Sequence, residues 1–230
     1  EGVTPPDALE GEDTGASFQI GYGDTKASNL WEYSWMQEWL DTYNTDSERA
    51  AKALAEALDP RGYEVHPIAS PEPHEKARHY LWRFWNRLPK TGHIAIFDRT
   101  WYGRVMVERL EGFCSTNDWQ RAYVEINEFE KELTDWGAII VKFWVQIDKD
   151  TQLERFKDRE NTPEKRWKIT EEDWRNREKW DSYEVAVNEM LQKTNTAYAP
   201  WHILESNDKK YARIKALKTV IEAIEDKLEK

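Results

Sequence analysis

Asp98 and Arg99 directly follow a short apolar run at residues 94–97. An unbroken apolar run of this length indicates a strand that is buried on both faces, as in parallel α/β sheets. The charged pair would then sit at the carboxyl end of the strand, where open α/β proteins bind their ligands. In phosphoryl-transfer proteins a carboxylate at this place holds Mg²⁺, and an arginine neutralises phosphate oxygens. A strand end with a surface ion pair would give the same pattern.

A second candidate site lies near the start of the chain, where a short strand is expected at 17–20. Two glycines, Lys26 and a predicted helix follow it. This order is typical of a phosphate loop, in which backbone amides cradle phosphate and the lysine adds charge. The full pattern is not met, because Thr25 stands where a glycine should precede the lysine and the spacing from Gly21 is one residue short. A plain turn before a helix fits equally well.

Two further stretches carry basic residues in patterns that suit a polyanion. A helix expected at 75–87 interleaves arginines, Arg83 among them, with aromatic residues, so its guanidinium groups could reach phosphate. Between 155 and 180, nine basic residues stand against seven acidic ones. The predicted helix, proline turn and second helix there would form a flap that closes over a phosphate chain. Snorkelling arginines and a solvated, salt-bridged face are the alternatives.

The composition of the chain limits the classes of function. The net charge of −11 argues against a general nucleic-acid or membrane binder. The chain has one cysteine, Cys114, so it has no internal disulfide framework and fits a reducing, cytoplasmic compartment. No apolar run is long enough to span a bilayer. The acidic residues 1–16 are expected to form a disordered lead-in.

The remaining elements must position these candidate residues. Strands are expected at 63–68, 138–145 and 202–205 as well as at 94–97, and the helical segments lie between them. This alternation predicts a doubly wound parallel sheet. Two helices are expected within 29–58, and the first has Trp31, Trp35 and Trp39 along one side. Thr170 is expected to cap a helix at 171–191. The other helices are expected at 105–111, 118–134, 150–159 and 209–228.

Seven motifs lie in a fixed order along the chain: Asp-Pro-Arg-Gly-Tyr (59–63), Tyr-Leu-Trp-Arg-Phe-Trp (80–85), Phe-Asp-Arg-Thr-Trp-Tyr-Gly-Arg (97–104), Val-Glu-Arg (107–109), Gly-Phe-Cys (112–114), Lys-Arg-Trp-Lys (165–168) and Ala-Pro-Trp (199–201). With these motifs the sequence from about Glu48 onward closely resembles the polyphosphate kinase 2 family, and is most similar to its polyphosphate:AMP phosphotransferase branch. The resemblance implies an α/β, P-loop kinase-like fold, with a parallel sheet flanked by helices and a helical basic lid at about 155–180. Residues 17–230 would form one such domain.

The resemblance also implies a function. Members transfer a phosphoryl group between inorganic polyphosphate and a nucleotide with Mg²⁺, so this chain would be a transferase, a kinase that acts on AMP or ADP, and a homo-oligomer. Asp98 matches the Walker B aspartate and would bind the metal, Arg99 matches the adjoining phosphate-facing arginine, and Arg104 matches the second arginine of that motif. The residues that match the basic lid are Arg155, Arg159, Lys165, Arg166 and Lys168.

The chain departs from the family pattern in one place. The family has a Walker A loop shortly before the Asp-Pro-Arg-Gly-Tyr motif, whereas residues 41–48 of this chain contain neither glycine nor lysine. Either the segment from Gly21 to Lys26 takes over this role or the loop is lost. A lost loop favours the alternative of a catalytically impaired member that binds polyphosphate or nucleotide. The sequence leaves open whether AMP, ADP or a guanine nucleotide is the acceptor, and the direction of transfer.

Overall fold

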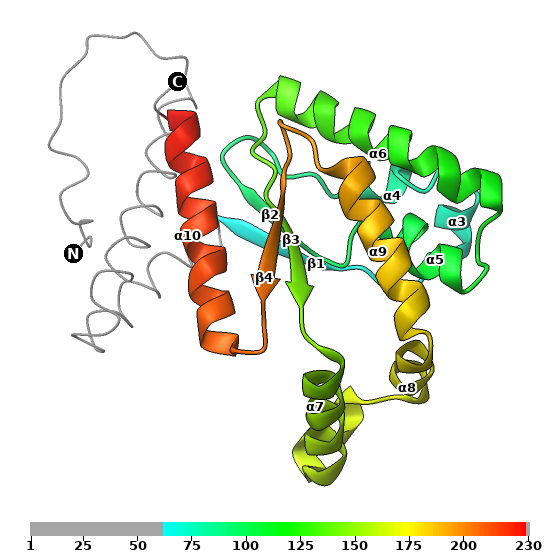
Figure 1. Ribbon diagram of the computed structural model, residues 1–230. Helices are drawn as coiled ribbons and strands as arrows, with labels where there is room; N and C mark the ends of the chain where they lie inside the picture. The colour runs from blue at the N-terminus through cyan, green and yellow to red at the C-terminus, as the bar shows by residue number, and fades with distance from the viewer. Residues whose placement is uncertain (1–61, 229–230) are drawn as a thin grey trace, which may run out of the picture. The chain divides into compact units, whose positions relative to one another are not determined.

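The computed structural model describes residues 62–228, in which strands and helices alternate (Figure 1). The described residues divide into two compact units: residues 62–101 and 224–228 belong to the first, and Tyr102–Ala223 form the second. The elements are β1 (Tyr63–Pro67), α3 (Pro73–Lys76), α4 (Trp82–Trp85), β2 (Ile94–Asp98), the 3₁₀ helix η1 (Trp101–Val105), α5 (Val107–Leu110), α6 (Thr116–Trp136), β3 (Lys142–Gln146), α7 (Lys149–Asn161), the 3₁₀ helix η2 (Pro163–Lys168), α8 (Glu171–Glu178), α9 (Trp180–Thr194), β4 (Trp201–Glu205) and α10 (Lys209–Leu228).

Several predicted features lie outside the described residues and stay predictions. They are the acidic lead-in at 1–16, the strand at 17–20, the phosphate loop with Lys26 and the pair of helices within 29–58. Within 62–228, none of the helices has the length and apolar composition needed to cross a membrane.

The first unit contains a sheet of two strands, β1 and β2, which run parallel. Tyr63 lies opposite Ile94 and Pro67 lies opposite Asp98, so the two strands begin and end together. Two parallel strands cannot be joined by a tight hairpin, and here the connection passes through α3 and α4. The parallel pairing predicted from the alternation of strands and helices is therefore confirmed.

The two faces of this sheet differ in burial. On one face the Phe97 ring packs against the rings of Phe84 and Trp101, at centroid distances of 6.0 and 5.6 Å. On the other face the cross-strand neighbours Val65 and Ile96 are 50% and 46% exposed. The prediction that the strand at 94–97 is buried on both faces is wrong for the described part of the chain. The reason is that the aromatic packing covers the Phe97 face and leaves Ile96 open.

The second unit contains its own parallel pair, β3 and β4. Lys142 lies opposite Trp201 and Gln146 lies opposite Glu205. The described strands thus form one parallel pair in each unit, and the single doubly wound sheet stays a prediction. The alternation of strand and helix sets the direction of each pair, but it does not determine how many strands pair side by side.

Helix α6 shows how the sequence builds the second unit. At its start the Ser115 hydroxyl accepts the Asp118 backbone N–H at 3.2 Å, and the Asp118 carboxylate accepts the Ser115 N–H at 3.1 Å. The helix ends at Trp136 and is capped by Gly137, whose φ of 115° is accessible to glycine without strain. Helix α6 packs against α9 (Figure 1). The apolar side chains that α6 buries are Ala122, Tyr123, Ile126, Phe129 and Leu133.

The helix predicted at 75–87 is interrupted and forms the short helices α3 and α4. In the turn between them the backbone N–H of Leu81 donates to the His79 ring at 3.4 Å. The imidazole accepts a backbone N–H that a backbone carbonyl would accept in a continuous helix. The prediction of one continuous helix is therefore wrong. The helix predicted at 105–111 likewise begins as η1 and continues as α5.

The helix predicted at 171–191 is divided at Lys179 into α8 and α9. Lys179 extends its ammonium group to the carboxylate of Glu111 at 2.6 Å, so the break coincides with a contact to the segment after α5. Thr170 caps α8 as predicted, and its backbone N–H donates to Asp173 at 2.8 Å. One predicted helix is therefore two helices with the predicted start.

An ion-paired carboxylate joins α3 to α4 in the first unit. The Glu75 side chain is 4% exposed and lies 3.3 Å from Arg83 and 3.1 Å from Arg87. It also accepts the backbone N–H of Glu72 at 3.0 Å. Burial alone raises the pKa of Glu75, but this hydrogen bond and the two arginines together hold that pKa below its ordinary value of 4.5. The ionised carboxylate therefore stabilises the folded unit at neutral pH.

We expect Glu75→Gln to lower the free energy of unfolding by about 2 kcal/mol at pH 7, because Arg83 and Arg87, whose side chains are 11% and 35% exposed, lose their buried counter-charge. The folded-state pKa of Glu75 is depressed, so its contribution is present above pH 4.5 and is lost as the pH falls through the folded value. Urea denaturation should show a smaller difference in the free energy of unfolding between wild type and variant at pH 4 than at pH 7. The exposed Glu72, replaced by Gln, is the control, and an equal gap at both pH values would contradict this account.

Candidate functional site

Asp98 ends β2 at the carboxyl edge of the first sheet, as predicted. Its backbone carbonyl accepts the N–H of Ile68 at 2.9 Å, so the pairing of β1 with β2 extends to the last residue of the strand. Side chains alternate along a strand, which puts Asp98 on the face of Ile96 and opposite to Phe97. The residue is exposed. The backbone of Asp98 is thus anchored while its carboxylate is open to a ligand.

Arg99 has a left-handed backbone. Its φ is 66°, and among residues 62–228 it is the one non-glycine residue with a positive φ. This conformation costs an L-residue about 1 kcal/mol or more. Such strain persists only where the surrounding structure imposes it, and it is concentrated at functional sites. The sequence predicted a role for Arg99, but it did not predict the strained turn.

Two packed rings hold this turn from both sides. Phe97 comes before Asp98 and Trp101 follows Thr100 in the chain. The two rings lie 5.6 Å apart, and both pack against Phe84, with the Trp101 ring 5.6 Å from Phe84 at an angle of 84°. Phe84 and Trp101 are buried. The three residues between Phe97 and Trp101 are therefore fixed at both ends, which explains how the strained backbone of Arg99 is maintained.

Arg104 lies in η1 and belongs to the second unit. Its guanidinium group is 3.2 Å from the Glu108 carboxylate. Its backbone carbonyl accepts the Cys114 thiol at 3.8 Å. Burial raises the pKa of Cys114, so the thiol keeps the proton that it donates. The contacts of Arg104 thus tie η1 to the segment that leads into α6.

Sequence analysis missed a buried polar cluster in the second unit. The Lys142 ammonium donates to the Tyr102 hydroxyl at 2.9 Å, to the Glu130 carboxylate at 2.8 Å and to the Thr194 carbonyl at 2.8 Å. Burial lowers the pKa of Lys142, and the charge of Glu130 opposes that shift. A signal was available in the sequence, because Lys142 is the single charged residue in the apolar run 138–145.

The helix, turn and helix predicted for the flap are present as α7, η2 and α8. The segment is held together by its own contacts. The Phe156 and Trp174 rings lie 5.1 Å apart. Arg177 donates to the Lys149 carbonyl at 2.6 Å and to the Gln152 side chain at 2.9 Å. Helices α7 and α8 are thus linked directly to each other.

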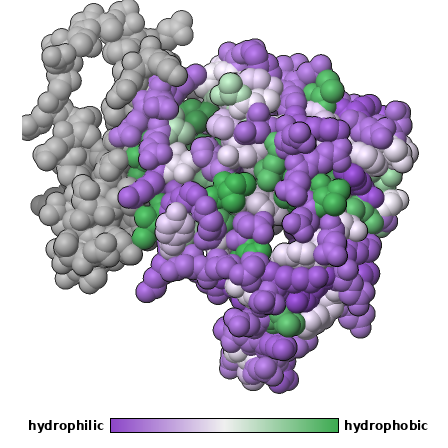
Figure 2. All heavy atoms as spheres, viewed as in Figure 1, coloured by the Kyte–Doolittle hydropathy of each residue, from purple (hydrophilic) through white to green (hydrophobic). Residues whose placement is uncertain are grey.

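The η2 turn presents basic side chains to solvent. Lys165, Arg166 and Lys168 are all exposed, and Trp167 between them is 75% exposed. Lys165 pairs with Asp158 at 2.9 Å and holds the pKa of that carboxyl below its ordinary value. The lobe that this segment forms at the bottom of the view is mostly hydrophilic (Figure 2). The predicted phosphate-binding residue Arg159 is half-buried on α7.

Two other predicted phosphate-binding arginines already have partners within the fold. Arg155 donates to the backbone carbonyl of Ser206 at 2.6 Å. Arg83 donates to the Ala69 carbonyl at 3.0 Å and pairs with Glu75, and its side chain is 11% exposed. In this structure both guanidinium groups brace neighbouring segments, and their predicted contact with phosphate stays a prediction.

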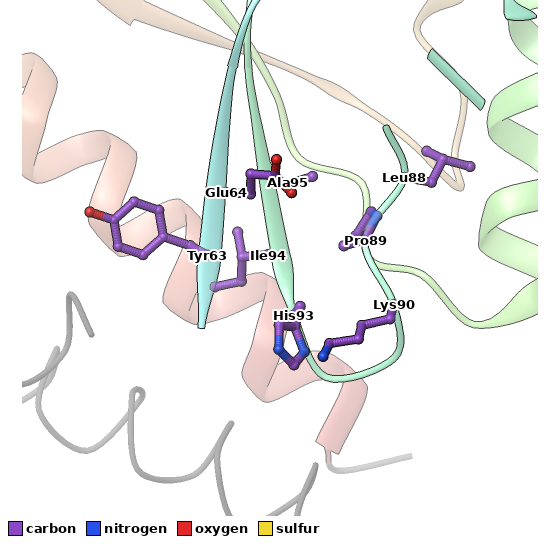
Figure 3. Close-up of a pocket in the computed structure, with 8 residues that line it drawn as sticks. All are labelled: Tyr63, Glu64, Leu88, Pro89, Lys90, His93, Ile94 and Ala95. Carbon is purple, nitrogen blue, oxygen red and sulfur yellow. The ribbon is translucent and has the colours of Figure 1, made fainter. Parts of the chain in front are cut away.

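A cavity of about 550 Å³ lies in the first unit, at the ends of β1 and β2 that are opposite to Asp98 (Figure 3). The first residue of each strand, Tyr63 and Ile94, lines it. Parallel α/β sheets bind their ligands at the carboxyl ends of the strands, so this cavity is distinct from the candidate site. Its other lining residues are Glu64, Leu88, Pro89, Lys90, His93 and Ala95.

The donor set at Asp98 suits a magnesium ion that is shared with substrate. Within residues 62–228 no group of three or more histidine, cysteine or acidic side chains is arranged to hold a metal. Mg²⁺ is usually bound by one or two carboxylates together with water and substrate phosphate oxygens, and one exposed aspartate meets that need.

Comparison with known proteins assigns the family. A family model described as polyphosphate kinase 2 matches residues 46–230. The polyphosphate:AMP phosphotransferase of Pseudomonas aeruginosa is 58% identical over 176 residues, which are 76% of this chain and 36% of that protein. The protein of the same name from Acinetobacter johnsonii is 56% identical over 175 residues, which are 76% of this chain and 37% of that protein. The chain thus spans about a third of the length of these curated relatives.

Solved structures agree with this assignment. The crystal structure of polyphosphate kinase 2 from Arthrobacter aurescens matches with a TM-score of 0.74 and 27% identity, over 98% of this chain and 84% of that one. The stretch matched by the family model contains the Asp98 strand end, η1 and the basic η2 turn. The chain therefore belongs to the polyphosphate kinase 2 family.

Proposed function

We propose that this chain is a kinase that transfers a phosphoryl group between inorganic polyphosphate and a nucleotide, with AMP or ADP as acceptor, on a P-loop kinase-like fold. The observation that carries the proposal is the strained Asp98-Arg99 turn at the carboxyl end of β2, in a stretch matched by the family model. AMP is favoured because relatives that are 56–58% identical are named polyphosphate:AMP phosphotransferase.

The proposed chemistry needs positioning and charge neutralisation, and no covalent intermediate on the protein. Asp98 is the residue that would hold Mg²⁺, which when bound offsets the negative charge on the phosphate oxygens. Arg99, fixed by its strained turn, places a guanidinium group next to that carboxylate in the chain. Arg104 is the second arginine of the same motif, and its proposed part is to supply positive charge to the phosphate groups.

The exposed bases of η2 supply the contact with polyphosphate. Lys165, Arg166 and Lys168 lie together on one turn, with Arg159 on the helix before it. Binding of a polyanion depends on this local field, and the net charge of −11 does not prevent it. Lys26 is the proposed lysine of the phosphate loop.

The alternative of a catalytically impaired member has little support. It rests on the altered segment at 41–48, which lies outside the described residues. The curated relatives that match 76% of the chain carry the names of phosphotransferases. These names and the strained turn at Arg99 favour an active enzyme.

We expect Asp98→Asn to reduce transfer at least about a hundredfold, because an amide is a poor ligand for Mg²⁺ and leaves the phosphate charge less neutralised. The measurement is ADP formation from AMP, polyphosphate and Mg²⁺. Asp135→Asn is the matched control, since Asp135 is an exposed aspartate on α6. Unchanged turnover in Asp98→Asn would show that this carboxylate does not hold the metal.

Arg99→Gly should separate activity from stability. Glycine adopts a φ of 66° without strain, so Arg99→Gly should be more stable to unfolding than Arg99→Ala by about 1 kcal/mol. Both variants lack the guanidinium group, and we expect both to lose at least about a hundredfold in kcat. Urea denaturation and steady-state kinetics on the pair test this. Wild-type turnover in either variant would exclude the proposed role of Arg99.

Lys165→Gln should raise the KM for polyphosphate roughly fivefold and leave kcat nearly unchanged, because a binding contact outside the reacting centre is lost. Added salt should reduce the difference between variant and wild type. Lys131→Gln is a close control, since Lys131 and Lys165 are 50% and 47% exposed and each pairs with an aspartate. Equal effects of the two changes on KM would indicate that the η2 turn has no special part in binding.

A further inference from the structure

The buried cluster around Lys142 connects four parts of the second unit. Tyr102 comes from η1, Glu130 from α6 and Lys142 from β3, and the Thr194 carbonyl lies at the end of α9. The Tyr102 hydroxyl donates to Glu130 at 2.7 Å and accepts from Lys142 at 2.9 Å. This one hydroxyl therefore attaches η1 to both members of a charge pair.

The charge pair is costly to bury. The Glu130 and Lys142 side chains are 0% and 4% exposed, and they lie 2.8 Å apart. Replacing a buried ion pair with apolar residues is often neutral or stabilising, so folding alone gives weak reason for a charge pair at this place. All three hydrogens of the Lys142 ammonium have acceptors, in Tyr102, Glu130 and Thr194. The Glu130–Lys142 pair differs from an apolar pair in that it makes hydrogen bonds of defined direction with the Tyr102 hydroxyl.

The link determines the position of η1. The Tyr102 ring lies 4.6 Å from the Trp201 ring, and the Trp201 indole N–H donates to the Thr194 hydroxyl at 2.9 Å. Tyr102 is 2% exposed and Val105 is fully buried, so both ends of the segment around Arg104 are packed. Tyr102 and Arg104 are two residues apart in one 3₁₀ helix, and rotation of Tyr102 would therefore move Arg104.

We propose that Glu130 and Lys142 are positioning residues, which hold η1 and thereby Arg104 through the Tyr102 hydroxyl. This inference rests on the proposed function for its catalytic consequence. The position of η1 can also be tested without activity, because Cys114 donates its thiol to the Arg104 carbonyl and is the single cysteine of the chain. A loosened η1 should expose that thiol.

The test variant is Tyr102→Phe, which removes the hydroxyl and keeps the ring. Its control is Tyr198→Phe, which removes a hydroxyl that donates to the Asn127 carbonyl of α6 at 2.9 Å. We expect Tyr102→Phe to lower kcat about tenfold to a hundredfold with little change in the KM for polyphosphate, because small misplacements of a reacting group have effects of this size. The reaction of Cys114 with a chromogenic disulfide should be at least about fivefold faster than in the control, because local opening controls access to the thiol.

The kcat and the rate of Cys114 modification together distinguish failure of the positioning role from failure of the proposed function. If wild type transfers phosphoryl groups and Tyr102→Phe matches Tyr198→Phe in both kcat and thiol reactivity, the positioning role is excluded. If wild type shows no transfer, the proposed function fails. Faster thiol modification in Tyr102→Phe would still support the hold on η1, and an unchanged rate would overturn it.

A second variant tests whether the cluster serves stability alone. The combination Tyr102→Phe, Glu130→Leu and Lys142→Met replaces the whole cluster with apolar groups and leaves no charge unpaired. We expect it to remain folded, with the low kcat and fast Cys114 modification of Tyr102→Phe. Recovery of wild-type kcat in this variant would show that the cluster only stabilises the fold.

Discussion

A lysine and a glutamate that are buried together set the arrangement of the second unit. Neither charge could be buried alone, because the penalty for an unpaired charge in the interior is large. Lys142 on β3 therefore requires Glu130 on α6, and together they fix the Tyr102 hydroxyl in η1. Lys142 also donates a hydrogen bond to the Thr194 carbonyl at the end of α9. The positions of η1, α6, β3 and α9 therefore depend on one another.

The first unit meets a different constraint at Asp98. The parallel strands end together, and the chain must then leave the sheet within three residues, between the packed rings of Phe97 and Trp101. Arg99 absorbs the change of direction with its φ of 66°. Glycine would adopt this φ with less strain, so an arginine at this position carries a local cost. A preorganised guanidinium group beside Asp98, the carboxylate proposed to hold Mg²⁺, would give a physical reason for that cost.

Much of the fold and part of the site follow from local patterns in the sequence. The strand before Asp98 was predictable because its apolar run is short and ends in charges, and α6 because its buried side chains repeat at helical spacing. The break at Lys179 and the strain at Arg99 were not, since each depends on a contact that is distant in sequence or on packed rings. Lys142 was overlooked because one lysine does not interrupt a strand pattern, and its partner is twelve residues away on another element.

The burial of its partner separates a structural arginine or lysine from one that can bind substrate. Arg83 has a carboxylate partner that is 4% exposed, and exchanging that partner for phosphate would leave the buried Glu75 with Arg87 in place of two guanidinium partners. The partner of Lys165 is Asp158, which is 62% exposed, so water can solvate Asp158 when the lysine moves to a phosphate group. The sequence gives both residues the same appearance, as bases near aromatic and acidic neighbours. The exposure of the partner carboxylate is thus the physical difference between the two pairs: the proposed exchange of an ion pair for a polyanion costs less at Lys165 than at Arg83.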